Sequence, residues 1–202
     1  MSNRQPYAAG QGAEGEQTKD KKKQRGGDNI KKMRAPLVEV GITVAMAFLL
    51  TVVMRLFVLQ IVTIDGVSME GTLHPSERVV VMMFDYWIDE PHRGDIVLCS
   101  YPDVEEKFIK RILALPGEMV LIRNGVVYVN GRPLPEPYID IPATEDFGPT
   151  MVEPDCYFVL GDNRTHSGDS RLASVGALPR ENISGRAVMM LNEMKVITRM
   201  QE

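Results

Sequence analysis

The pattern of apolar and polar side chains divides this chain into three regions. Residues 1–35 contain almost no large apolar side chains and are rich in Gly, Gln, Lys and Asp. Such a segment cannot bury enough apolar surface to offset the entropy lost on ordering, so we expect a disordered tail. A continuous apolar run follows, and beyond it the sequence changes to short apolar stretches separated by turns.

The continuous apolar run predicts one transmembrane helix over residues 36–59. Its apolar part, residues 37–59, would cross a hydrocarbon core of about 30 Å at the helical rise of about 1.5 Å per residue. Glu39 lies in the first turn, where it can reach the headgroups, and Arg55 lies near the far end, where its stem can extend outward. The Lys and Arg residues before the run predict a cytoplasmic N-terminus and place residues 60–202 outside the cytoplasm.

Two other interpretations of the apolar run fit the sequence less well. A cleaved signal peptide would have a shorter apolar region followed by a small-x-small cleavage site, whereas Gln60 to Ile64 contain no such site. A buried helix of a soluble protein would show a polar face, and this run has none. We therefore expect a retained single-pass membrane anchor.

Residues 60–202 predict a mostly β domain. Asn124-Gly125 between two apolar stretches is a strong hairpin signal, and Asn130-Gly131 predicts a second turn. The Pro-rich segment 131–154 suits a long loop or a sheet edge, and Asp169 to Leu178 could include a short helical turn. Strands are expected within residues 77–84, 94–101, 106–115, 118–124, 125–131, 156–160 and 182–191.

Charge is distributed unevenly along the chain. Residues 1–36 contain nine Lys and Arg against four Asp and Glu, and the remainder contains 14 against 23. The basic tail lies directly before the apolar run, which favours an orientation signal over nucleic-acid binding. The acidic remainder lacks the clustered Lys and Arg that neutralise phosphates, so we expect no nucleic-acid partner.

The cysteines and histidines give no framework for a metal site or a disulfide network. Cys99 and Cys156 each lie in an apolar, strand-like stretch, which favours small buried thiols, although the sequence leaves a disulfide between them open. The histidines, His74, His92 and His166, have neither HExxH nor CxxC spacing. A protein-bound catalytic metal is therefore not expected.

Ser68 and Lys110 are the candidates for nucleophilic chemistry. Gly66 and Gly71 permit tight turns on either side of Ser68. A serine hydroxyl needs a base, and a lysine among apolar strand neighbours is desolvated, which lowers its pKa and lets it accept a proton. Ser–Lys pairs are a known alternative to the Ser–His–Asp triad. His74 is close in sequence, but no carboxylate is placed to orient it.

Strand alternation predicts the surroundings of this lysine. It places Phe108 and Ile112 on the same face as Lys110, and Ile109 and Arg111 on the opposite face. A structural interpretation competes with the catalytic one, because most strand lysines are solvated and most serines beside glycines form turns. The pattern alone leaves both interpretations open.

A dense polar loop, GDNRTHSGDSR at residues 161–171, follows an apolar strand. Its acids and arginines could form a self-paired polar turn, or they could brace Ser167 near the lysine. A metal site is a further alternative, but interleaved arginines would oppose a cation. The polar residues concerned are Asp162, Asn163, Arg164, Asp169 and Arg171.

Three motifs occur in order after the apolar run: GVSMEGTL at 66–73, FIKRILALPGE at 108–118 and GDNRTHSGDSR at 161–171. Together they resemble the bacterial type I signal peptidase (leader peptidase) family, in particular its single-pass, Gram-positive-like members. The resemblance covers residues 37–191. Its specificity comes from three separate motifs in the right order.

The resemblance implies roles for individual residues. Ser68 matches the nucleophile and Lys110 the general base. Gly71 replaces the proline that usually follows the SMx triplet, which makes the loop less rigid. Gly66 replaces a serine that some members use in the oxyanion hole, so the hole would rest on backbone N–H groups, including that of Ser68. Supporting roles fall to Asp162, Ser167, Asp169 and Arg171, and shallow substrate pockets would be lined by Ile64, Met69 and Ile109.

The resemblance also implies an activity. It is the removal of signal peptides from exported preproteins by a membrane-bound serine endopeptidase that cuts after small residues (A-x-A-like) and uses no cofactor. Expected partners are preproteins, the lipid bilayer and the export machinery. Three alternatives stay open: a Ser–Lys enzyme that processes itself or one partner, an inactive anchored β-domain that binds exported chains, and a soluble domain with a core helix.

Overall fold

A computed structural model describes residues 38–53 and 59–198 of the chain. It forms two compact units, Met1–Val52 and Val53–Glu202. A helix covers residues 38–53, and no helix among the described residues is long and apolar enough to cross a membrane. The predicted tail and part of the predicted anchor lie outside the described residues, so the transmembrane helix stays a prediction. Leu59, the last residue of the predicted span, is the first residue of strand β1.

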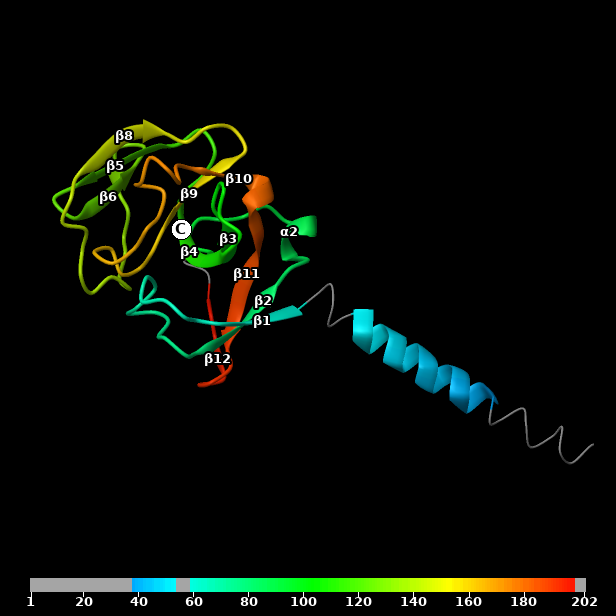
Figure 1. The fold of residues 1–202 in the computed structure, drawn as a ribbon. Helices are drawn as coiled ribbons and strands as arrows, with labels where there is room; N and C mark the ends of the chain where they lie inside the picture. Colours follow the sequence, from blue (N-terminus) through cyan, green and yellow to red (C-terminus); the bar gives the residue numbers. More distant parts are fainter. Residues whose placement is uncertain (1–37, 54–58, 199–202) are drawn as a thin grey trace, which may run out of the picture. The chain divides into compact units, whose positions relative to one another are not determined.

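The second unit is built on two antiparallel sheets (Figure 1). In the larger sheet the strand order is β1-β2-β11-β3-β4-β9-β10, and β12 pairs with β11. Its strands are β1 (Leu59–Thr63), β2 (Arg78–Met82), β3 (Ile96–Ser100), β4 (Lys107–Ala114), β9 (Cys156–Leu160), β10 (Leu178–Pro179), β11 (Ile183–Met190) and β12 (Lys195–Val196). The mostly β fold predicted for this region is confirmed.

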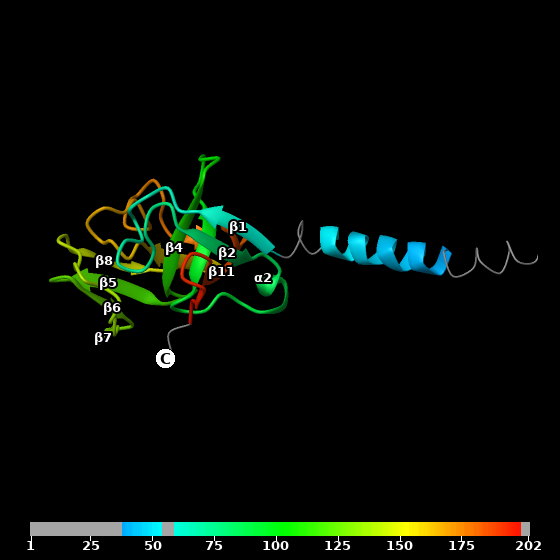
Figure 2. The same ribbon diagram turned by 90° about the horizontal axis from the view of Figure 1, so that it is seen from below.

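The smaller sheet has the order β7-β6-β5-β8, with β5 (Met119–Arg123), β6 (Val126–Val129), β7 (Arg132–Pro133) and β8 (Phe147–Met151). Figure 2 shows these strands on the side of the domain away from β1 and α2. Both predicted turns are confirmed, because Asn124-Gly125 joins β5 to β6 and Asn130-Gly131 joins β6 to β7. All four turn residues have positive φ, the conformation that Asn-Gly hairpin turns require.

The Pro-rich segment contains a strand that the sequence pattern did not reveal. Pro149 lies in β8, which forms the edge of the smaller sheet and pairs only with β5. An edge strand tolerates the missing N–H of proline, so the expected sheet-edge geometry is found. Gly148 lets this strand approach closely, since a Cβ there would lie 2.5 Å from the Val120 carbonyl oxygen.

Each of the seven predicted strands is present, whereas β1, β7, β8, β10 and β12 were not among the predicted strands. The helix α2 (Asp85–Ile88) and the 3-10 helix η1 (Arg180–Asn182) were not predicted, because elements this short have no periodicity to detect. In place of the expected helical turn, residues 169–176 form two successive hydrogen-bonded turns: the Leu172 N–H donates to the Asp169 carbonyl at 2.9 Å, and the Gly176 N–H donates to the Leu172 carbonyl at 2.9 Å.

Alternating side chains of β4 join different parts of the core. Ile109 packs in a cluster with Met69 and Leu98, whereas Ile112 belongs to a cluster on the other face with Val97. The predicted alternation along this strand is therefore confirmed. Both cysteines are free and buried, as the favoured interpretation expected.

Candidate active site

Ser68 and Lys110, 42 positions apart in sequence, meet in the folded domain. Lys110 Nζ and Ser68 Oγ share a hydrogen bond of 2.6 Å, and Nζ also donates to the Ile109 carbonyl at 3.1 Å. Lys110 lies on β4, and only 2% of its surface is exposed. The second bond leaves the amine aimed at the serine, so the pair is arranged for proton transfer between hydroxyl and amine.

Burial is the main influence on the charge of Lys110, and it lowers the pKa of the amine. Asp169 and Asp162 act in the opposite direction, because a nearby negative charge favours the ammonium form. Cys99 would act likewise as a thiolate, but burial raises its own pKa to about 12, so the thiol is uncharged at neutral pH. The net effect lowers the pKa of Lys110, which increases the fraction of neutral amine, the form that can accept a proton.

A compact turn holds the nucleophile in place. Met69 and Leu73, which follow Ser68, are both buried, and the Leu73 N–H donates to the Met69 carbonyl at 2.8 Å. The Ser68 carbonyl accepts a hydrogen bond of 3.0 Å from the Asn163 N–H, which ties this turn to the polar loop. Gly71 has a φ of 100°, a backbone conformation closed to proline. The turn in this chain thus differs from one that carries proline at that position.

An ion pair links the base strand to the polar loop and to the nucleophile turn. Arg111 Nε and Nη2 donate to the two carboxylate oxygens of Asp162 at 2.9 and 2.6 Å. Thr72 Oγ1, four residues after the nucleophile, donates to the same carboxylate at 2.6 Å. Because Arg111 follows Lys110 directly, this one carboxylate connects the elements that carry both reactive side chains.

A second ion pair is local to the polar loop. Arg171 binds Asp169 through Nε at 2.8 Å and Nη2 at 2.9 Å, and the Gly161 N–H donates to the same carboxylate at 3.1 Å. The loop does not pair entirely with itself, since Asp162 binds Arg111 and Arg164 binds Glu136. Arginines occupy both carboxylates that could have served as metal ligands.

Ser167 is placed close to the nucleophile turn. Its Oγ is buried and has no hydrogen-bond partner among the residues that the structure describes. A Cβ at Gly161 would lie 2.2 Å from Ser167 Oγ and 2.4 Å from the Ser68 carbonyl oxygen, so these groups close around the glycine. The predicted role of Ser167 in orienting Lys110 stays a prediction, because no hydrogen bond joins the two side chains.

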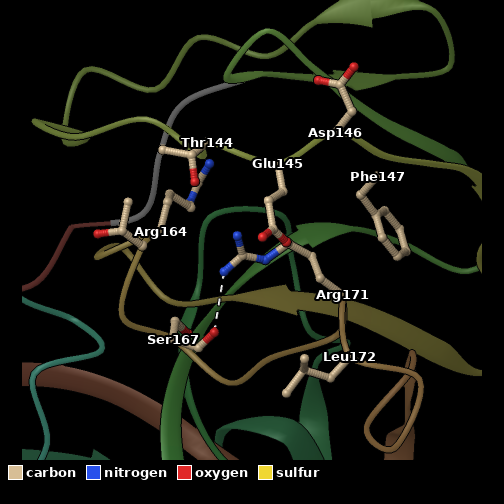
Figure 3. A pocket seen from close by; sticks show the side chains of 9 residues that line it. Thr144, Glu145, Asp146, Phe147, Arg164, Ser167, Arg171 and Leu172 are labelled. Atoms are coloured by element: carbon tan, nitrogen blue, oxygen red, sulfur yellow. Dashed lines mark hydrogen bonds between the residues drawn. The ribbon is translucent and has the colours of Figure 1, made fainter.

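A cavity of about 270 Å³ lies beside the polar loop (Figure 3). Ser167, Arg164 and Arg171 line one side of it, and the Arg171 guanidinium donates to the Ser167 carbonyl at 3.3 Å. Glu145 lines the cavity as well. Both arginines already hold carboxylates, so this cavity offers no free cation.

Two larger pockets meet at the reactive pair, and both are lined by Ser68, Lys110 and Gly66. One has a volume of about 550 Å³, and the other, of about 500 Å³, extends towards Tyr101 and Leu172. The residues predicted to line a substrate pocket, Ile64, Met69 and Ile109, all border the first.

Backbone N–H groups can form an oxyanion site beside the nucleophile. The Ser68 N–H makes no hydrogen bond within the described part of the chain. Gly66 has no side chain that could contribute a donor, and a Cβ added there would meet nothing within 4 Å. Free backbone N–H groups aimed at a reacting carbonyl are the usual construction of an oxyanion hole.

Comparison with known proteins gives this geometry a context. Residues 37–192 match the model of the family described as "Signal peptidase, peptidase S26". The chain belongs to this signal peptidase family. Family members are serine endopeptidases, and the known activity of signal peptidases is the removal of signal peptides from preproteins.

Several relatives carry the family name. Signal peptidase I of Leptolyngbya laminosa is 39% identical over 78% of this chain and 81% of its own length. Signal peptidase I S of Bacillus subtilis (strain 168) is 36% identical over 83% and 97%. A signal peptidase I crystal structure from Enterococcus faecalis V583 is 32% identical, with a TM-score of 0.44 over 48% of this chain and 97% of that one.

Some residues of this site were missed by sequence reasoning. Arg111 and Thr72 bind Asp162, Glu136 binds Arg164, and the Tyr138 ring covers Arg111. None of Arg111, Thr72, Glu136 and Tyr138 was proposed as a site residue. The adjacent Lys-Arg in the FIKR motif could have indicated Arg111. Glu136 and Tyr138 lie in the Pro-rich segment, and nothing in the sequence places that segment against the site.

Proposed function

We propose that this signal peptidase uses Ser68 as nucleophile and Lys110 as its general base. The observation that carries the proposal is the 2.6 Å contact between Ser68 Oγ and a buried Lys110 Nζ. Ser68 attacks the scissile carbonyl while the neutral amine takes its proton, and the Ser68 N–H stabilises the oxyanion. The ammonium of Lys110 then protonates the leaving amine. The regenerated neutral amine of Lys110 activates a water molecule, which hydrolyses the acyl-enzyme and frees Ser68.

The proposed substrates are preproteins with small residues at the first and third positions before the cut. The pocket lining of Ile64, Met69 and Ile109 supports apolar side chains at these positions, because these three residues are apolar and border the space beside Ser68. Small apolar side chains fit there without leaving polar groups unpaired. The chemistry needs no cofactor.

The proposed location is the outer face of the cell membrane. Residues 36–59 would span the bilayer once with the tail 1–35 in the cytoplasm, as the basic tail and the apolar run support. Holding enzyme and preprotein in the same bilayer raises their effective concentration. The export machinery that delivers the preprotein is then a neighbour of the enzyme.

Preprotein cleavage by the full chain in detergent or vesicles tests this proposal. We expect Ser68→Ala and Lys110→Ala each to abolish processing, and Lys110→Arg to fail as well, because a guanidinium keeps its proton. Appreciable processing by any of these purified variants would reject the pair. Cleavage of several unrelated preproteins distinguishes a general enzyme from one dedicated to a single partner, and acylation of Ser68 by an inhibitor excludes an inactive binding domain.

A further inference from the structure

One aromatic side chain of the Pro-rich segment lies directly on the ion pair beneath the reactive residues. The Tyr138 ring centroid is 3.9 Å from Arg111 Cζ, within the range of a cation–π contact. Arg111 is the residue that binds Asp162 with two hydrogen bonds. The ring therefore covers one face of the guanidinium and limits its freedom to leave the carboxylate.

Glu136 binds a second arginine, which belongs to the polar loop. Arg164 donates to both carboxylate oxygens of Glu136, and its Nε donates to the Gly161 carbonyl at 3.1 Å. The Tyr138 hydroxyl donates to Glu136 at 2.8 Å, so the two side chains act as one unit. The Tyr138 ring covers the guanidinium of Arg111, and Glu136 binds that of Arg164. These two arginines in turn bind the sequence neighbours Asp162 and Gly161 respectively.

The same segment also touches the nucleophile turn. A Cβ at Gly71 would lie 3.8 Å from the Tyr138 carbonyl oxygen and 3.7 Å from a carboxylate oxygen of Asp140. Residues 136–140 thus pack against the nucleophile turn, the base strand and the polar loop. No side chain of this segment lines either of the two pockets at Ser68, so its influence on chemistry would be indirect.

We propose that Glu136 and Tyr138 are positioning residues that keep the Arg111–Asp162 pair closed and thereby keep the Lys110 amine buried beside Ser68. The inference rests on the proposed function of Lys110 as base. Neither side chain has to touch the substrate. They act through the two arginines that organise Gly161 and Asp162.

Electrostatics supply the link to Lys110. The charges that act on it are the carboxylates of Asp162 and Asp169 in the polar loop, whereas Cys99 on β3 faces it as an uncharged thiol. Each carboxylate is paired with an arginine, and that cation offsets its effect. If Arg111 loosens, Asp162 acts uncompensated and water enters, so the pKa of Lys110 rises and less of the neutral base is present.

The test is the pH dependence of kcat/KM for preprotein cleavage by the full-length enzyme and three tyrosine variants. Tyr138→Leu removes the ring, and Tyr138→Phe keeps the stacking but loses the hydroxyl. Tyr128→Leu on β6 in the smaller sheet is the matched control, since this tyrosine is also partly buried. Thermal unfolding of each variant reports whether it has folded.

For Tyr138→Leu we expect the rising limb of the profile to move to higher pH by about half a unit to one unit, a roughly three- to tenfold loss on the acid side. Tyr138→Phe should recover most of that shift, and Tyr128→Leu should leave the limb in place. A folded Tyr138→Leu enzyme with lower activity but an unmoved limb would overturn the inference. A wild-type profile without a depressed lysine limb would instead overturn the proposed function.

Where Tyr138→Leu fails to fold, Glu136→Gln decides. It keeps the size of the side chain while weakening the hold on Arg164, and we expect a smaller upward shift of the same limb. An unmoved limb in a folded Glu136→Gln enzyme would also contradict the inference.

Discussion

The two ends of the polar loop repeat one arrangement with different consequences. Each end has a glycine followed by a buried aspartate that binds an arginine with two hydrogen bonds: Gly161-Asp162 with Arg111, and Gly168-Asp169 with Arg171. The first pair joins residues 51 apart, and the second joins residues two apart. Arg111 is 5% exposed and Arg171 is 16% exposed.

The comparison shows that an ion pair matters through what it connects. Asp162 connects the base strand to the nucleophile turn through Arg111 and Thr72, so its loss would disturb both reactive side chains. Asp169 shapes one loop, and water can partly replace its partner. The two pairs have the same chemistry, and only the first couples distant parts of the chain.

The largest difference between the two ends of the loop is expected from substitution of Gly161 and Gly168, measured as the loss in kcat/KM. A Cβ at Gly161 would meet Ser167 Oγ at 2.2 Å and the Ser68 carbonyl oxygen at 2.4 Å, whereas at Gly168 it would meet only Leu172 Cδ1 at 3.5 Å. Displacing the nucleophile by about 1 Å can cost on the order of 100-fold in rate. We expect Gly161→Ala to lose at least that factor in kcat/KM. Gly168→Ala is the control, and a loss from it as large as that from Gly161→Ala would contradict the distinction.

Removal of the carboxylate charge from each ion pair should lower the free energy of unfolding by different amounts. Asp162→Asn leaves Arg111 buried without its counter-charge, at a cost of about 3–5 kcal/mol in the free energy of unfolding. Asp169→Asn should cost about half of that or less, because the more exposed Arg171 can regain hydration. Urea denaturation of the full chain in detergent measures both, and equal losses would refute the ranking.

The same variants predict a pH effect. Asp162 and Asp169 both raise the pKa of Lys110, so removal of either negative charge should lower it. We expect the rising limb of kcat/KM in folded Asp169→Asn to move to lower pH, opposite to the shift expected from Tyr138→Leu. Movement to higher pH would show that the carboxylate acts on Lys110 through structure and not through charge.

The smallest expected effect comes from adding a side chain at Gly66. Gly66 has open space for a side chain and borders both pockets at Ser68. Gly66→Ser would add a hydroxyl donor near the oxyanion, and we expect a rise in kcat of a few-fold, less than the roughly 100-fold lost when a dedicated donor is deleted. Gly66→Ala is the control. An equal rise in kcat from Gly66→Ala would show that the hydroxyl is not the cause.

Sequence reasoning reached the parts of this molecule that leave a local signature. Seven of the strands and both Asn-Gly turns follow from apolar strand-like runs and from the positive φ that asparagine and glycine tolerate. Ser68 and Lys110 came from motifs, and the fold brings their side chains to 2.6 Å. The prediction required no knowledge of the path between them.

Long-range pairing could not be predicted in the same way. That Asp162 binds Arg111, and that Tyr138 covers Arg111, depends on how strands and loops distant in sequence meet. The edge strand β8 was missed because Gly148 and Pro149 hide its alternation, and its register comes from β5. Ser167 shows the same limit, since its motif predicted a contact with Lys110 and the structure places its buried oxygen beside Gly161.

The central claim is that burial lowers the pKa of Lys110 so that it can serve as the base for Ser68, and the pH dependence of wild-type kcat/KM tests it most directly. Preprotein cleavage by the full chain should be followed from mildly acidic to alkaline pH under conditions where the enzyme stays folded. We predict a rise through a single ionisation whose midpoint lies below the ordinary lysine pKa of about 10.4. A flat profile, or a rise that continues through the ordinary lysine value, would contradict the account.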